Sequence, residues 1–372
     1  MRSDVISYLD SRADEARVLL CELAQIPAPS HQEERRAEFC LSWLRSMGAE
    51  GAYVDEALNV IYPVGDTGEN DLMVFMAHSD VVFPDLEELP LRVVDGKIYC
   101  PGVGDDTANV VAMLMTAGWI AGEKIVPKGC GVLLVINSGE EGLGNLKGSR
   151  KIMADFGHRV KEFITFDGNA NAVVTKAVGS RRLRVMVTTE GGHSYARFGA
   201  PNAIAQLSSI ISRLYEIRVP EIGRTTYNVG TISGGTSVNT IAQNAEMLFE
   251  FRSDERKALD IMQGHFDRVL EEFRDLGVNI EVEVVGDRPC GLEVDNSFLA
   301  ERAVRAVEAH YGFVPRFSVG STDCNIPLSM GIAAICPGCV MGAGAHTREE
   351  YVEIDSLLPG LKVAAELILH HF

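Results

Sequence analysis

Residues 72–80 read Leu-Met-Val-Phe-Met-Ala-His-Ser-Asp and give the clearest indication of the fold. Leu72–Ala77 is a continuous apolar run, which suits a strand buried on both faces of a mostly parallel sheet. Polar side chains, beginning with His78, follow this run directly. Because sites in open α/β sheets form at the carboxyl ends of the strands, the stretch predicts a buried strand with a polar site at its end.

The same pattern recurs along the chain. Three further short apolar runs are followed by turns, at Val132–Ile136, Phe163–Phe166 and Ile332–Ile335. Helical patterns lie between the runs, notably Thr107–Ala121 and Ala300–His310. This alternation predicts an α/β fold with a mixed, mostly parallel sheet that has helices on both faces.

The first fifty residues are predicted to be mainly helical. The segment up to Pro27 has a helical pattern, and Ser30 with Glu33 forms a capping-box pattern that predicts a second helix start. Apolar residues then repeat at helical spacing: Ala37, Cys40, Leu41, Leu44 and Met47.

Residues 179–287 follow a different order. Their patterns predict a strand, a helix, two strands, a helix and a strand, at Leu183–Thr188, Ala203–Ile217, Tyr227–Ile232, Glu246–Phe251, Arg256–Leu276 and Asn279–Val285. This β-α-β-β-α-β order is that of a ferredoxin-like fold. We therefore expect 179–287 to form a smaller α+β domain inserted into a larger one, whose two parts are 1–178 and 288–372.

Charge and hydropathy narrow the class of protein. The net charge is -18, from 34 basic and 52 acidic side chains, which argues against nucleic acid or an anionic membrane as a partner. The charged N-terminus has no apolar core of a secretory signal, and no apolar run approaches the length of a membrane span. We therefore expect a cytoplasmic protein, with its eight scattered cysteines acting as small buried apolar residues.

Metal-binding side chains follow the predicted strands. Besides His78, these are the pair Glu140-Glu141 after the second run, Asp167 after the third and His346 after the last, while a glycine-containing loop leads into Asp105. Any one of them alone is more readily explained as an exposed polar residue. Together they form a carboxylate cluster, and clustered carboxylates raise one another's pKa unless a cation joins them. Their recurrence predicts a metal centre.

With these motifs the sequence resembles the two-zinc exopeptidases and deacylases related to peptidase T, carboxypeptidase G, aminoacylase and succinyl-diaminopimelate desuccinylase. The resemblance covers nearly the whole chain and rests on His-x-Asp at 78–80, Gly-x-Gly-Asp-Asp at 102–106, Gly-Glu-Glu-Gly at 139–142, Phe-Asp-Gly at 166–168, Gly-Gly-His-Ser at 191–194 and Gly-x-His at 344–346. It implies a zinc-binding α/β domain with an inserted ferredoxin-like lid that forms a homodimer.

The resemblance also implies a division of roles among the metal ligands. Asp105 would bridge two zinc ions and would precede a cis peptide bond. His78 and Asp167 would complete one ion, and Glu141 and His346 the other. Cobalt or manganese can occupy such N/O ligand sets in place of zinc.

Catalytic roles follow from the same resemblance. Glu140 would be the general base that takes a proton from a metal-bridging water. Asp80 would accept a hydrogen bond from the His78 imidazole and fix its tautomer. His193 would be supplied to the site of the neighbouring subunit, although by itself it is also explained as a turn residue.

Four further residues match positions that bind substrate in the family. Asn239 and Arg252 would hold a substrate carboxylate, for which the planar fork of arginine is suited. Arg252 is equally explained as a surface ion pair at a strand end. Ser321 and Thr322 would line the same pocket, with Ser321 in place of a glycine.

The expected activity is hydrolysis of the amide bond of a short peptide, by an aminopeptidase or a di/tripeptidase. Asp at position 167 favours a peptidase, since the deacylase branches tend to carry Glu there. One departure is Thr107 and Ala108, where many relatives have Lys and Gly. An N-acyl-amino-acid deacylase and a non-catalytic metal- or peptide-binding module are the alternatives; a substrate panel separates them.

Overall fold

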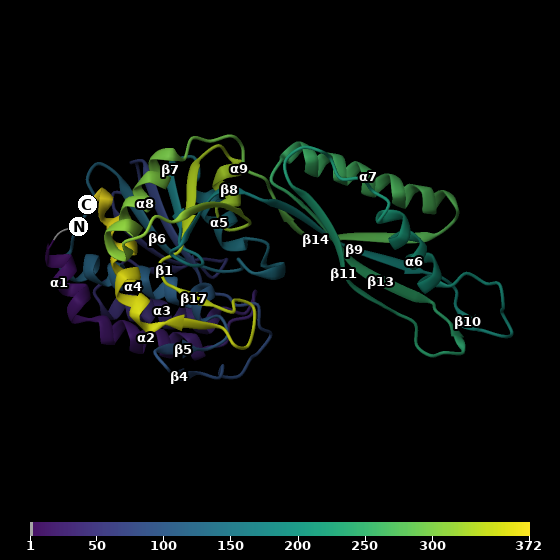
Figure 1. Cartoon of the computed structure of the whole chain (residues 1–372), viewed down its shortest axis with the longest axis horizontal. Coiled ribbons are helices and arrows are strands. Elements are labelled where there is room, and N and C mark those ends of the chain that lie inside the picture. Colours follow the sequence, from purple (N-terminus) through teal and green to yellow (C-terminus); the bar gives the residue numbers. More distant parts are fainter. Residues whose placement is uncertain (1–2) are drawn as a thin grey trace. The chain divides into compact units, whose positions relative to one another are not determined.

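The computed structural model describes residues 3–372, so Met1 and Arg2 of the expected segment 1–178 lie outside the described residues. The chain forms two compact units (Figure 1). The first comprises the residues up to Ala177 together with Leu292–Phe372, and the second spans Val178–Gly291. The expected insertion, 179–287, lies within the second unit.

A mixed sheet organises the first unit. Its strands, in spatial order, are β1 (Tyr53–Val54), β2 (Val60–Gly65), β6 (Gly131–Asn137), β3 (Leu72–His78), β7 (Val160–Thr165), β16 (Ala333–Pro337), β8 (Ala172–Ala177) and β15 (Arg316–Gly320). The central strands β6, β3, β7 and β16 are parallel, whereas β1 and β2 run antiparallel to their neighbours. The mixed α/β class predicted from the sequence is therefore confirmed.

Helices cover both faces of this sheet. Along β6, which is buried throughout, Val132 and Leu134 belong to one apolar cluster and Leu133 and Val135 to another, since successive side chains point to opposite faces. The first cluster includes residues of α1 (Ser3–Ser11), α2 (Ala13–Gln25), α3 (Glu34–Ser46), α4 (Ala108–Glu123), α8 (Ser297–Tyr311) and α10 (Ile354–Ile368). The second includes residues of α5 (Lys147–Phe156) and α9 (Asn325–Ser329).

Strand register brings the polar residues to one edge. His78 of β3 pairs with Asn137 of β6, and Met76 of β3 pairs with Thr165 of β7. The residues that follow these parallel strands therefore emerge side by side.

A small sheet joins distant segments of the first unit. It consists of β17 (Gly342–Ala343), β18 (Tyr351–Glu353), β5 (Lys97–Tyr99) and β4 (Arg92–Val94), in that order. The sheet places the turn at Val103–Thr107 next to β18. Its short strands carry no long apolar run, and the sequence patterns did not predict it.

The larger sheet of the second unit is antiparallel and four-stranded, with the order β11, β13, β9, β14. Along the chain the elements are β9 (Gly179–Thr188), α6 (Ala203–Leu214), β11 (Thr225–Gly234), β13 (Asn244–Ser253), α7 (Arg256–Asp275) and β14 (Asn279–Arg288). The two helices share one apolar cluster with inward-facing residues of β9 and β13. A short ribbon pairs β10 (Gly192–His193) with β12 (Thr240–Ile241).

The helical pattern predicted up to Pro27 is confirmed, as α1 and α2. One prediction about the N-terminal segment was wrong. The capping box at Ser30 and Glu33 does not form, because the Ser30 hydroxyl donates to Asp80 at 2.6 Å and Glu33 makes no side-chain cap at the start of α3. Among residues 3–372, no helix has the length and apolar character needed to cross a membrane.

Candidate metal centre

Asp105 lies between two imidazoles. Its Oδ1 is 3.0 Å from His78 Nε2, and its Oδ2 is 3.1 Å from His346 Nε2. The same His346 nitrogen is 3.2 Å from Glu141 Oε1. Two donor atoms bound to one tetrahedral zinc lie roughly 3.3–3.6 Å apart, so the observed separations are close to those around a shared ion.

Glu141 provides a test of whether these residues fit a metal. Its Oε1 is buried and has no hydrogen-bond donor among the described residues, although His346 is nearby. A buried carboxylate oxygen without a donor is costly, and a bound cation removes that cost. Donor atoms of His78, Asp105 and Glu141 all lie within 4.8 Å of one another. The residues therefore fit a metal ion.

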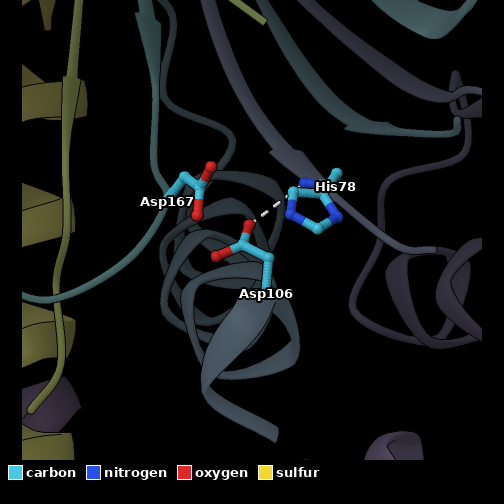
Figure 2. Close-up of side chains that lie close together, drawn as sticks. All are labelled: His78, Asp106 and Asp167. Carbon is cyan, nitrogen blue, oxygen red and sulfur yellow. Dashed lines mark hydrogen bonds between the residues drawn. The ribbon is translucent and has the colours of Figure 1, made fainter. Parts of the chain in front are cut away.

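A second group of candidate ligands consists of His78, Asp106 and Asp167, whose donor atoms also lie within 4.8 Å of one another (Figure 2). The structure thus brings Asp167 to the site from the end of β7. Asp106 was not among the expected ligands, and its two oxygens accept hydrogen bonds from the His78 backbone N–H at 3.1 Å and Asn109 Nδ2 at 2.6 Å. Asp106 therefore holds the backbone of His78 by a hydrogen bond.

Burial and the mutual repulsion of the carboxylates shift the pKa values of the cluster in the directions that a bound cation would relieve. Burial, reinforced by the charge of Asp105, raises the pKa of Asp167 to about 7. The nearby carboxylates of Asp105 and Glu141 raise the pKa of His346 to about 10. Burial opposes the charged form of His78, yet hydrogen bonds to Asp105 and Asp80 hold its pKa well above the usual range. The carboxylates thus draw positive charge, and metal binding to such a site displaces protons.

Asp80 connects the ends of two strands. Its fully buried carboxylate accepts the backbone N–H groups of Glu140 and Glu141, both at 2.9 Å, and the Ser30 hydroxyl. The Nδ1 atom of His78 lies 3.1 Å from the Asp80 carbonyl oxygen and 3.5 Å from its Oδ1. Asp80 therefore orients the adjacent glutamates as well as the histidine. Ser30 was missed because its sequence pattern indicated a helix cap.

Backbone geometry is unusual at two of the candidate ligands. The peptide bond between Asp105 and Asp106 is cis. His346 has a φ of 64°, in the left-handed region that residues other than glycine seldom adopt. Left-handed conformations of residues other than glycine cluster at functional sites.

The expected substrate residues of the first unit shape a turn. The Thr322 backbone N–H donates to Asn325 Oδ1 at 2.9 Å, and its hydroxyl accepts from the Cys324 N–H at 3.2 Å. Ser321 precedes this turn. Asp323 lies within it and accepts from Asn137 Nδ2 at 2.7 Å, so the turn packs against the end of β6.

The remaining expected residues belong to the second unit, and their described contacts lie within it. His193 and Asn239 are exposed, and the Ser194 N–H donates to the Asn239 carbonyl at 3.0 Å, which places both on one ribbon. The Arg252 guanidinium donates two hydrogen bonds to Glu250, each of 3.0 Å. This is the strand-end ion pair considered as the alternative for Arg252.

A small cavity of about 60 Å³ lies beside Asp105. Small residues make up much of its lining, which consists of Gly104, Asp105, Gly168, Asn169, Gly342, Ala343, Ala345, Glu350 and Tyr351. The cavity offers room for a small group next to the proposed shared ligand.

Histidines and carboxylates gathered at the carboxyl edge of a sheet, with a further glutamate beside them, are typical of metal-dependent hydrolases. A family model described as Peptidase family M20/M25/M40 matches residues 74–370. The chain therefore belongs to this family and is an enzyme of the metallopeptidase and related amidohydrolase class.

Individual relatives differ in the reaction that their names describe. The chain is 26% identical over 368 residues to a succinyl-diaminopimelate desuccinylase from Corynebacterium glutamicum, covering 96% of each chain. Among solved structures, a tripeptidase from Staphylococcus aureus has a TM-score of 0.77 at 24% identity, covering 96% of this chain and 97% of that one. A Bacillus subtilis protein described as a dinuclear metal-binding peptidase has a TM-score of 0.65 at 18% identity, covering 97% and 98%.

Proposed function

We propose that this protein hydrolyses the amide bond of short peptides as an aminopeptidase or a di/tripeptidase, with two zinc ions at its active site. The observation that carries the proposal is the position of Asp105, whose two carboxylate oxygens face His78 and His346 separately. A carboxylate in this position is suited to bridge two ions. Asp167 would complete the ion at His78, and Glu141 the ion at His346.

Glu140 is the proposed general base. Zinc, when bound, polarises the substrate carbonyl and lowers the pKa of water. Glu140 takes the proton from the attacking water and delivers it to the departing amine. Its backbone N–H is fixed by Asp80 at 2.9 Å, and the side chain is buried next to Glu141. Asp80 thus holds the backbone of both glutamates.

The second unit is proposed to act as a lid and as the dimerisation domain. His193 would donate a hydrogen bond to the developing oxyanion in the active site of the other subunit. Its exposure on a short ribbon, together with Asn239, supports a role in contacts beyond its own unit. Arg252 would exchange Glu250 for a substrate carboxylate, because its guanidinium already binds a carboxylate with both arms. Ser321 and Thr322 would contribute to the substrate pocket from the first unit.

An N-acyl-amino-acid deacylase is the second candidate. The desuccinylase relative favours it, since that enzyme class cleaves the same kind of bond in an acylated amino acid. Asp167 favours the peptidase, as does the likeness of the fold to a tripeptidase.

A substrate panel tests the proposal. Zinc-loaded protein is incubated with tripeptides, dipeptides, and acetyl- or succinyl-amino acids, and the release of free amine is followed. We expect cleavage of the unmodified peptides. Cleavage of only the acylated compounds would establish the deacylase instead, and cleavage of neither set by the metal-loaded protein would contradict both proposed activities. Repeating the assay with cobalt and manganese identifies the most effective metal.

A further inference from the structure

Two buried charged side chains outside the proposed ligand set hold the loops that carry His78 and Asp105. We propose that Arg36 and Glu350, here called the loop clamp, are positioning residues that keep these two ligands at a metal-binding separation. The inference rests on the proposed function, because it concerns how the proposed metal centre is held.

Glu350 fixes the backbone of the Asp105 loop. Its Oε1 accepts the N–H groups of Gly104 and Asp105, both at 2.8 Å, and its Oε2 accepts the N–H of Gly102 at 3.0 Å. Burial raises the pKa of Glu350 to about 7, while these three N–H donors favour its ionised form. A Cβ atom at Gly104 would lie 3.3 Å from Glu350 Oε1, so glycine permits this close approach. One carboxylate thereby determines the path of the chain into the shared ligand.

Arg36 ties the same loop to the strand end that carries His78. Its Nη1 donates to the Ser79 carbonyl at 2.9 Å and to the Thr107 hydroxyl at 3.0 Å. Thr107 in turn donates to the Gly102 carbonyl at 2.6 Å. A single guanidinium nitrogen therefore joins the residue after His78 to the loop of Asp105. The other nitrogens anchor the group to the carbonyls of Ala24 and Ile26.

Burying the charged side chain of Arg36 costs free energy of desolvation, and its directed hydrogen bonds offset that cost. The side chain is fully buried, and burial lowers its pKa to about 10, while acidic groups that include Asp80 and Glu350 act in the opposite direction. An apolar side chain of similar volume would fill the space without the desolvation cost of a charge. The planar fork of arginine supplies what an apolar residue does not, namely directed hydrogen bonds to two loops at once.

Removing either half of the clamp should weaken zinc binding more than it lowers the stability of the fold. The test compares Arg36→Met, which removes the charge and the fork, and Glu350→Gln, which replaces an accepting oxygen with a donor. Exposed neighbours of the same type provide matched controls, Arg35→Met and Glu349→Gln. We expect the two clamp variants to bind zinc about 10- to 100-fold more weakly in competition with a chelator, and the controls to bind as wild type.

Two further measurements separate positioning from general stability. The visible spectrum of the cobalt-loaded protein reports ligand geometry, and we expect it to change in the clamp variants and not in the controls. Arg36→Lys, which keeps the charge without the fork, should recover part of the affinity. Clamp variants that fold and bind two ions with wild-type affinity and an unchanged cobalt spectrum would overturn the proposal.

If Arg36→Met or Glu350→Gln does not fold, the variant Thr107→Val tests the loop clamp instead. It leaves both charges in place and removes only the hydroxyl between Arg36 and the loop. We expect weaker zinc binding with little change in unfolding temperature, and wild-type zinc affinity would refute the clamp. Absence of zinc binding by the wild-type protein would instead contradict the proposed function, so the two failures are distinguishable.

Discussion

Glu140 and Glu141 are adjacent in the chain, yet their surroundings differ. Glu141 Oε1 lies near His346 and belongs to a group of potential ligand atoms within 4.8 Å of one another. Neither such group found among the described residues includes Glu140. We therefore propose different roles for the two side chains, ligand for Glu141 and proton carrier for Glu140.

Glu140→Ala should therefore retain both metal ions and lose turnover. Loss of a general base typically lowers the rate by about 10²–10⁴-fold, and we expect kcat to fall in this range. Zinc content and kcat are measured on the same preparation, with the exposed Glu87→Ala as control. A variant that hydrolyses substrate as fast as the wild type would rule out this role for Glu140.

The site residues that could be predicted from the sequence are those next to a recognisable local pattern. His78 and Asp167 each follow an apolar run, and Asp105 follows a loop of glycines. Glu350 carries no such signal, because its partner Gly102 lies 248 positions away in the chain. In the sequence, Arg36 cannot be distinguished from the other charged residues of its helix. Contacts of this kind depend on the tertiary structure and are invisible to local patterns.

At the scale of elements, buried strands were predicted best. The runs at 72–77 and 132–136 correspond to β3 and β6, since strands buried on both faces are apolar throughout. β15 was missed because it lies at the sheet edge, where much of its surface is exposed. Helix α5 begins in a polar loop and was also missed.

One ion-pair network links β7, α8 and the C-terminal residues. Glu162 of β7 lies 2.6 Å from Arg302 Nη1 and 3.1 Å from His371 Nε2. Burial alone would raise the pKa of Glu162, but the hydrogen bonds from His371 and Arg302 lower it to about 2. The ionised carboxylate therefore stabilises the fold above its unfolded pKa of about 4.3. This stabilisation is lost as the pH falls towards 2.

Glu162→Gln should accordingly destabilise the protein at neutral pH, by about 1–3 kcal/mol, a range between those of exposed and buried ion pairs. The difference from wild type should shrink as the pH falls from about 4.5 to 3, because Glu162 of the unfolded wild-type chain gains its proton in this range while the folded chain keeps it ionised. Urea unfolding midpoints at pH 7 and pH 3 measure this difference. A difference that is as large at pH 3 would show that the charge of Glu162 is not its source.

At the scale of the whole molecule, the strand and helix order of 179–287 was predictable because each element has a clear apolar period. Apart from the short strands β10 and β12, the elements from β9 to β14 follow the expected β-α-β-β-α-β order. The proposed role of this unit in a homodimer is tested by variants of His193.

We expect a homodimer in which each active site uses His193 of the other subunit. His193→Ala and Glu140→Ala homodimers should both be weakly active. Random mixing of the two variants should restore about a quarter of wild-type activity, because half of the dimers then contain one complete site. Sedimentation gives the mass of each species. A monomer with full activity, or a mixture no more active than its components, would contradict the shared site.

The number of zinc ions bound per chain tests the central claim most directly. Metal-free protein is titrated with zinc, and the same titration is made with Asp105→Ala. We predict two ions per wild-type chain and at most one in the variant, because Asp105 faces both His78 and His346. A wild-type chain that binds fewer than two ions, or a variant that binds two with unchanged affinity, would contradict the account.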